Sequence, residues 1–97
     1  MRPEESGCLA PHLGSPFAGY RHIDWFGPAC WATADIRVRR FTCSCQRVSY
    51  EFGQAGGCYA IQRTIKAADG LIIERTALMR LSEADRLWAD IFSGAAR

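Results

Sequence analysis

From Arg47 to Phe52, polar and apolar residues alternate without a break. A period of two is typical of a strand with one face in a core and the other in water. Val48, Tyr50 and Phe52 are therefore expected to face the core. Further strand patterns are found at residues 21–25, 36–39, 59–65 and 71–79, separated by turn signals at 27–28, 43–46, 53–57 and 69–70.

A single helix is predicted over residues 82–93. Ser82 is a suitable N-cap, Asp85 stands where a capping box needs an acceptor, and Gly94 can end the helix. Its apolar residues form one stripe: Ala84, Leu87, Trp88, Ile91 and Phe92. Because a helix this short is marginal alone in water, the stripe must dock on the sheet. The expected fold is α+β, an antiparallel β-meander of four to five strands with one C-terminal helix packed on it.

The length fits one domain, because 97 residues cannot form two cores. Residues 1–19 are rich in proline and glycine and lack periodicity, which predicts a flexible N-terminal arm before a single domain at 20–97. No apolar stretch is long enough to cross a membrane, and no secretory signal follows the acidic start. A cytoplasmic location is therefore expected.

The five cysteines are an odd number, and disulfides are rare in a reducing cytosol. One hypothesis is a tetrahedral zinc site, built on the close pair Cys43 and Cys45 and leaving Cys8 out, with these ligands: Cys30, Cys43, Cys45 and Cys58. Zinc-binding pairs usually have two to four intervening residues, and this pair has one. The thiols are therefore expected to be small packing residues, with no cofactor. A redox pair beside basic residues is a further alternative.

Positive charge is concentrated in the middle of the chain. Residues 36–66 carry six basic residues against Glu51 alone. Basic strands with aromatic residues are typical of modules that hold single-stranded nucleic acid, which predicts a binding face made by Arg37, Arg39, Arg40 and Arg47. The alternative is a solvated arginine face, because the alternation places Tyr50 and Phe52 inside, where they cannot stack on bases.

Three aromatic residues, Trp25, Phe26 and Trp31, flank the turn at 27–28. They are candidate anchors for a protein partner, or else part of the core. The edge strands of a meander also leave homodimerisation open. Catalysis is not expected, because nothing brings His12, His22 and a nucleophile together, and no phosphate-binding loop is present.

Residues 39–97 resemble small proteins of high-GC actinobacterial genomes and their mobile elements. The residues that carry the resemblance are Cys43-x-Cys45, Tyr50-Glu51-Phe52, Gly56-Gly57-x-Tyr59, and Leu87-Trp88 ahead of residues 93–97. It implies no activity, cofactor or site. The sequence therefore predicts a small non-catalytic binding or regulatory module that contacts nucleic acid or a protein partner, with a homodimer or a zinc-stapled domain as alternatives.

Overall fold

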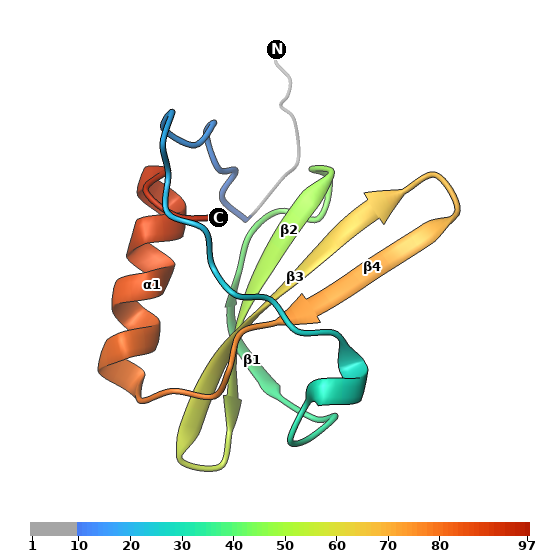
Figure 1. Cartoon of the computed structure of the whole chain (residues 1–97), viewed down its shortest axis with the longest axis vertical. Helices are drawn as coiled ribbons and strands as arrows, with labels where there is room; N and C mark the ends of the chain where they lie inside the picture. The colour runs from blue at the N-terminus through green and yellow to red at the C-terminus, as the bar shows by residue number, and fades with distance from the viewer. Residues whose placement is uncertain (1–9) are drawn as a thin grey trace.

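The strands follow one another across a single sheet in a computed structural model that describes residues 10–97 (Figure 1). Their order is β1-β2-β3-β4, and each strand is antiparallel to the next. The elements are β1 (Arg37–Phe41), β2 (Val48–Ala55), β3 (Cys58–Ala67), β4 (Gly70–Arg75) and α1 (Leu81–Ser93). The expected α+β meander with a C-terminal helix is confirmed. No helix within residues 10–97 is long and apolar enough to span a bilayer.

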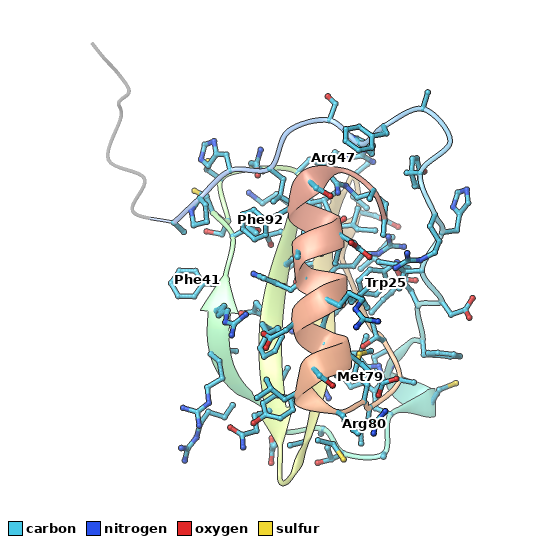
Figure 2. The ribbon with its side chains drawn as sticks, turned by 90° about the vertical axis from the view of Figure 1, so that its left-hand side faces the viewer. Trp25, Phe41, Arg47, Met79, Arg80 and Phe92 are labelled. Carbon is cyan, nitrogen blue, oxygen red and sulfur yellow. The ribbon has the colours of Figure 1, made fainter. Side chains whose placement is uncertain are left out.

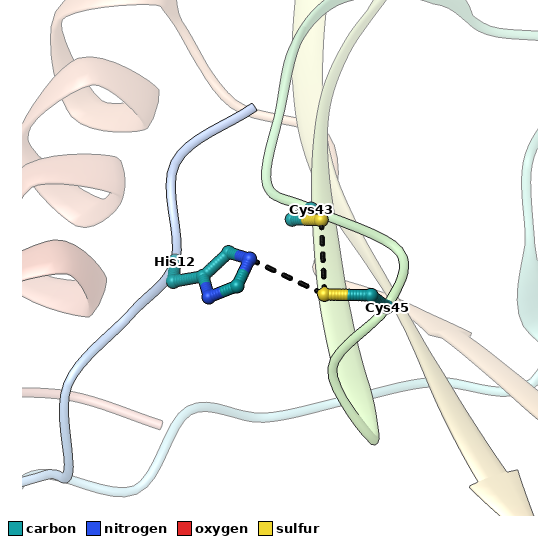
Figure 3. Close-up of side chains that lie close together, drawn as sticks. All are labelled: His12, Cys43 and Cys45. Atoms are coloured by element: carbon teal, nitrogen blue, oxygen red, sulfur yellow. Dashed lines mark hydrogen bonds between the residues drawn. The ribbon is translucent and has the colours of Figure 1, made fainter. Parts of the chain in front are cut away.

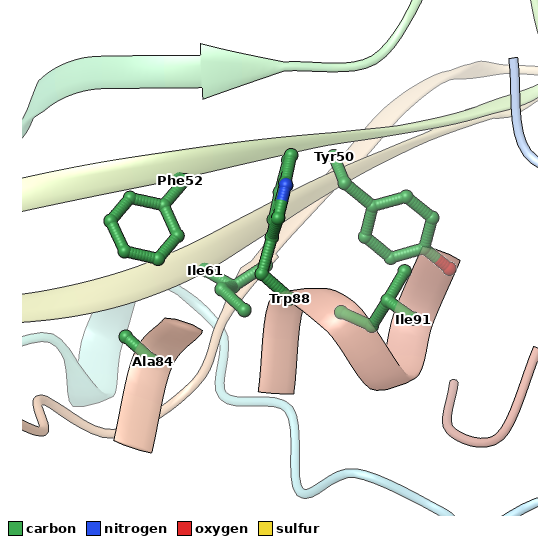
Figure 4. Close-up of a cluster of buried hydrophobic side chains, with 6 residues drawn as sticks. All are labelled: Tyr50, Phe52, Ile61, Ala84, Trp88 and Ile91. Atoms are coloured by element: carbon green, nitrogen blue, oxygen red, sulfur yellow. The ribbon is translucent and has the colours of Figure 1, made fainter. Parts of the chain in front are cut away.

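The core lies between one face of the sheet and α1 (Figure 4). Tyr50 and Phe52 of β2 are buried, as the alternation predicts, and Ile61 of β3 lies beside them. From α1, the stripe contributes Ala84, Trp88 and Ile91. The Trp88 ring meets the Phe52 ring edge-on at 82°, with centroids 5.8 Å apart, a favourable aromatic geometry.

Residues 21–25 do not form the expected strand. Arg21 makes an isolated bridge with Ala96 near the chain end, and Phe26, just beyond the expected strand, makes another with Arg75 of β4. Arg21 N–H donates to Ala95 O, and Phe26 exchanges two hydrogen bonds with Arg75. The expected strand at 71–79 is also shorter, ending at Arg75. Directly after Arg75, the side-chain Oγ1 of Thr76 accepts the Ile61 N–H, where a backbone carbonyl would accept it in a continuing strand.

Helix α1 begins one residue earlier than expected. Arg80, not Ser82, is its N-cap, and the Arg80 N–H donates to Glu83 Oε1 at 3.2 Å. Gly94 ends the helix with φ 88°, as predicted, because this left-handed conformation suits glycine. The expected turn at 53–57 narrows to Gly56 and Gly57, since β2 continues to Ala55.

The chain before β1 covers parts of both sheet faces. Trp25 packs against the core on the helix side, whereas the 3-10 turn η1 (Pro28–Cys30) and Trp31 lie near Arg75. The Arg75 guanidinium lies 3.8 Å from the Trp31 ring centroid and donates to Gln62 Oε1 and to the carbonyls of Thr33 and Ala34. Burial lowers the pKa of Arg75 from its usual value.

Candidate metal centre

Three potential metal ligands meet where residues 10–13 pass the loop between β1 and β2 (Figure 3). Their donor atoms, on His12, Cys43 and Cys45, all lie within 4.8 Å of one another. The two Sγ atoms are 3.2 Å apart, and His12 Nε2 is 3.2 Å from Cys45 Sγ. Within residues 10–97, no further histidine, cysteine or carboxylate joins this group.

The β1–β2 loop fixes the positions of the two sulfurs. Thr42 bonds to Tyr50 twice, through its own N–H to Tyr50 O and through its Oγ1, which accepts the Tyr50 N–H. Cys43 follows directly and is buried, whereas Cys45 is exposed. The loop turns within the next residues, so that both sulfurs come together on one side (Figure 3). One thiol is thus held by the fold and the other lies at the surface.

Hydrogen bonds on both sides of His12 hold its segment against this loop. The Cys43 N–H donates to Pro11 O at 2.9 Å. The Leu13 N–H donates to Gln46 Oε1 at 3.1 Å, and Gln46 Nε2 donates back to Leu13 O at 3.3 Å. Since residues 11 and 13 are both tied down, the imidazole between them is presented to the thiols by the backbone. Residues 10–13 of the predicted N-terminal arm are therefore part of the site.

The geometry is suitable for a tetrahedral zinc ion. Zn–S bonds of about 2.3 Å and Zn–N bonds of about 2.05 Å, at tetrahedral angles, place two sulfurs about 3.8 Å apart and sulfur and nitrogen about 3.6 Å apart. The observed distances of 3.2 Å differ from these by about half an ångström, which small side-chain rotations supply. Two thiolates and an imidazole are also the donor types that zinc prefers.

The ligand set expected from the sequence is corrected at two positions. Cys43 and Cys45 do come together, but Cys30 and Cys58 lie elsewhere and are exposed. Cys58 pairs with Ala55 at the end of β2 opposite the β1–β2 loop, and Cys30 belongs to η1 beside Trp31. Cys30 and Cys58 are equally far along the chain from the pair Cys43 and Cys45. This spacing does not bring them close in space, because β2 and β3 run the full length of the sheet.

His12 is the candidate ligand that sequence reasoning missed. The sequence pattern puts His12 in a predicted flexible arm and offers it only as a catalytic candidate. No periodicity marks residues 10–13, so the hydrophobic pattern gave no sign that they contact the sheet. The available signal was the short spacing of Cys8 and His12, a cysteine and a histidine with three residues between them, which is common in zinc sites.

The four arginines of the expected nucleic-acid face do not gather in one place. Arg37 and Arg39 line a small hollow with Gln54 and Gly56. Arg40 lies on the helix side, 2.8 Å from Asp85 and over the ring of Phe52. Arg47 lies near the β1–β2 loop, and its Nε donates to Lys66 O.

The three aromatic residues expected at a partner surface are also separated. Trp25 packs on the core cluster and carries the Arg63 guanidinium 4.3 Å from its ring centroid. Trp31 Nε1 donates to Phe26 O, and both residues line an apolar pocket beside Arg75 on the far side of β4. Phe26 is 40% exposed. The structure thus leaves Phe26 and Trp31 accessible from one pocket and assigns Trp25 to packing.

Comparison with known proteins adds no family. No protein-family model matches the chain, and none of the curated proteins or solved structures compared with it is a significant match.

Proposed function

We propose that this protein is a small non-catalytic module whose N-terminal segment is stapled to its sheet by one zinc ion. The observation that carries the proposal is the convergence of His12, Cys43 and Cys45 within 4.8 Å. A single hydrophobic core of this size supplies little stability, and zinc binding contributes directly to folding. The ion would act structurally, joining residues 10–13 to the β1–β2 loop in a reducing, cytoplasmic setting.

The proposal is tested by native mass spectrometry on protein purified without chelator and supplied with zinc. We expect a mass excess of one zinc per chain. Replacement of a ligand, Cys45→Ser or His12→Ala, should abolish the excess. Removal of zinc from the wild type should also lower its melting temperature, because the folded state binds the ion and the unfolded state binds it more weakly.

The chain offers matched controls for each ligand type. Cys30→Ser and Cys58→Ser remove exposed thiols that lie outside the cluster, and His22→Ala removes the other histidine. All three variants should keep the zinc. A metal-free mass for the wild type in the presence of zinc, or equal loss in the control variants, would overturn the proposal.

A second candidate is homodimerisation through the sheet face that α1 does not cover. Side chains of both edge strands line a groove there, with Val38 and Phe41 from β1 and Leu71 from β4. Phe41 is 56% and Leu71 63% exposed. The groove also contains Glu51 and Lys66, one charge of each sign. A two-fold axis that brings Glu51 of one copy to Lys66 of the other repeats this contact, so the groove carries the charges that self-association needs.

Nucleic-acid binding through Arg37, Arg39, Arg40 and Arg47 stays a prediction. It would have to use separate sites, because one of these side chains is engaged with Asp85 and the others lie near different ends of the sheet. Weak binding that falls steeply with salt is its signature. A face that included Arg40 would also have to break its contact with Asp85.

A further inference from the structure

We propose that a pocket beside Tyr50 binds a small phosphate monoester with an apolar body. This Tyr50 pocket has a volume of about 410 Å³ and lies at the end of the helix-covered sheet face that is next to the β1–β2 loop. Leu13, Gly14 and Pro16 form one wall, and β2 and β3 form the floor. Its volume is in the range of small-molecule sites. Binding of such a ligand goes beyond the proposed function and does not require zinc.

Three guanidinium groups line the Tyr50 pocket, and no carboxylate side chain lines it. Arg47 precedes β2, Arg63 belongs to β3, and Arg97 follows α1. Arg63 is paired with Glu74 at 2.9 Å, whereas within residues 10–97 neither Arg47 nor Arg97 has an ion pair. The Arg97 carbonyl oxygen is directed elsewhere, since it accepts the N–H of Ile23. The side chains at the pocket therefore leave two positive charges uncompensated.

Hydrogen bonds to neutral groups hold the two unpaired guanidinium groups in place. Arg97 Nη2 donates to Gly14 O at 2.8 Å, and its Nη1 donates to Ile91 O. Arg47 Nε donates to Lys66 O at 3.3 Å. These carbonyls fix the side chains without cancelling their charge, and each guanidinium keeps further N–H donors. Because the groups are already positioned, binding an anion costs less conformational entropy.

The Tyr50 phenol adds a neutral donor near two of these charges. In Figure 4 its hydroxyl points away from Trp88. Burial raises the pKa of Tyr50, while the positive charges of Arg97 and Arg63 and a hydrogen bond from Arg63 oppose this shift. Since a guanidinium only donates, Tyr50 Oη accepts from Arg63 and its own proton remains for an acceptor in the pocket.

A phosphate monoester fits both the charge and the lining of the Tyr50 pocket. At pH 7 it carries close to two negative charges and offers three acceptor oxygens, whereas a carboxylate carries one charge. Arginine forks are well suited to phosphate oxygens. Val48 and Ile65 pair across β2 and β3 and line the pocket together with Leu13. They give the rest of the ligand an apolar surface.

Isothermal titration calorimetry with phenyl phosphate tests the proposal. We expect one phenyl phosphate per chain, no binding of phenol, and benzoate binding weaker by about tenfold or more, because it has one charge less. Arg47→Ala should weaken phenyl phosphate binding by about tenfold, since a charge-assisted hydrogen bond is lost. Arg37→Ala is the matched control: it removes an exposed arginine that lines a different hollow, and it should leave the affinity unchanged.

Backbone amide chemical shifts locate the ligand on the wild-type protein, so this readout does not depend on the folding of a variant. We expect phenyl phosphate to shift Gly14 and Val48, which line the Tyr50 pocket, and to leave Gly56 beside Arg37 unchanged. Absence of binding, benzoate as tight as phenyl phosphate, or equal loss in the two variants would overturn the proposal. Shifts at Gly56 in place of Gly14 would overturn it as well. Both measurements report on the ligand and not on the metal, so they decide whether or not zinc binds.

Discussion

At the scale of single residues, Tyr50 links the stability of the core to pH. Burial raises the pKa of the Tyr50 phenol above its usual value of 10.0, although the nearby Arg97 and Arg63 partly oppose this shift. The folded state therefore holds the phenol proton more tightly than the unfolded state. The stability that this provides is complete below pH 10 and is lost as the pH rises from about 10 towards the folded-state pKa.

Tyr50→Phe should remove this part of the alkaline instability. We expect the variant to be less stable than the wild type at pH 7, because the hydroxyl loses its hydrogen bond with Arg63. The difference should shrink between pH 10 and pH 12, where only the wild type must keep a buried phenol protonated. Urea denaturation at several pH values measures this. A difference between the two proteins that stays constant across the range would contradict the prediction.

The same scale shows where sequence reasoning succeeds and fails. Tyr50 and Phe52 could be assigned to the core because strand alternation is a local property of the chain. Cys43 and Cys45 could be paired for the same reason, since a hairpin loop holds them together. Cys30 could not be excluded and His12 could not be included, because both depend on where irregular segments cross the sheet. That path is set by tertiary hydrogen bonds, such as the one from Cys43 to Pro11.

At the scale of elements, the C-terminal end of α1 packs against residues 15–17 of the N-terminal segment. Gly94 has φ 88°, and its carbonyl accepts the N–H of Phe17 at 2.8 Å. A Cβ at this position would lie 3.0 Å from Ser15 O and 3.2 Å from Pro16 Cα. Both the backbone conformation and the close approach of residues 15–17 therefore require glycine here.

Gly94→Ala should lower the free energy of unfolding by about 1–2 kcal/mol, the cost of a left-handed conformation for a residue with a Cβ. Displacement of residues 15–17 should add to this. Urea denaturation at pH 7 provides the measurement. Gly14→Ala is a matched control in the neighbouring segment, because a Cβ there meets nothing within 4 Å. Equal effects of the two substitutions would show that the conformation at Gly94 is not the cause.

Most of the elements could be predicted from the sequence. The antiparallel meander and the packing of the C-terminal helix on it follow from periodicity and turn signals, and both are confirmed. One expected strand, residues 21–25, does not form. The other errors fall at element ends, where side chains replace backbone partners. Thr76 ends the ladder of β4 by bonding Ile61 through its hydroxyl, and Arg80 takes the N-cap position in place of Ser82. Neither feature changes the spacing of apolar residues along the chain, so hydrophobic periodicity does not predict it.

At the scale of the whole molecule, the two sheet faces are covered unequally. One face is closed by α1 and Trp25, while the other has an open groove between the edge strands β1 and β4, which Cys43 and Cys45 also line. Figure 2 shows α1 lying across the first face, with Phe41 projecting beyond β1 at the side. A groove with exposed apolar residues and unpaired strand edges favours association.

If a second copy covers this face, Leu71→Glu should keep the protein monomeric where the wild type dimerises with rising concentration, because a carboxylate would be buried in the contact. Ile72→Glu is the matched control: Ile72 is 47% exposed, and because strand residues alternate it points to the opposite face of the same strand. Sedimentation equilibrium over a range of concentrations distinguishes the Leu71 variant from the Ile72 variant.

A charge exchange tests the contact between Glu51 and Lys66. Glu51→Lys should weaken the dimer, and the added change Lys66→Glu should restore it. A wild type that is monomeric at every concentration, or equal loss in the Ile72 variant, would exclude this face as the dimer interface.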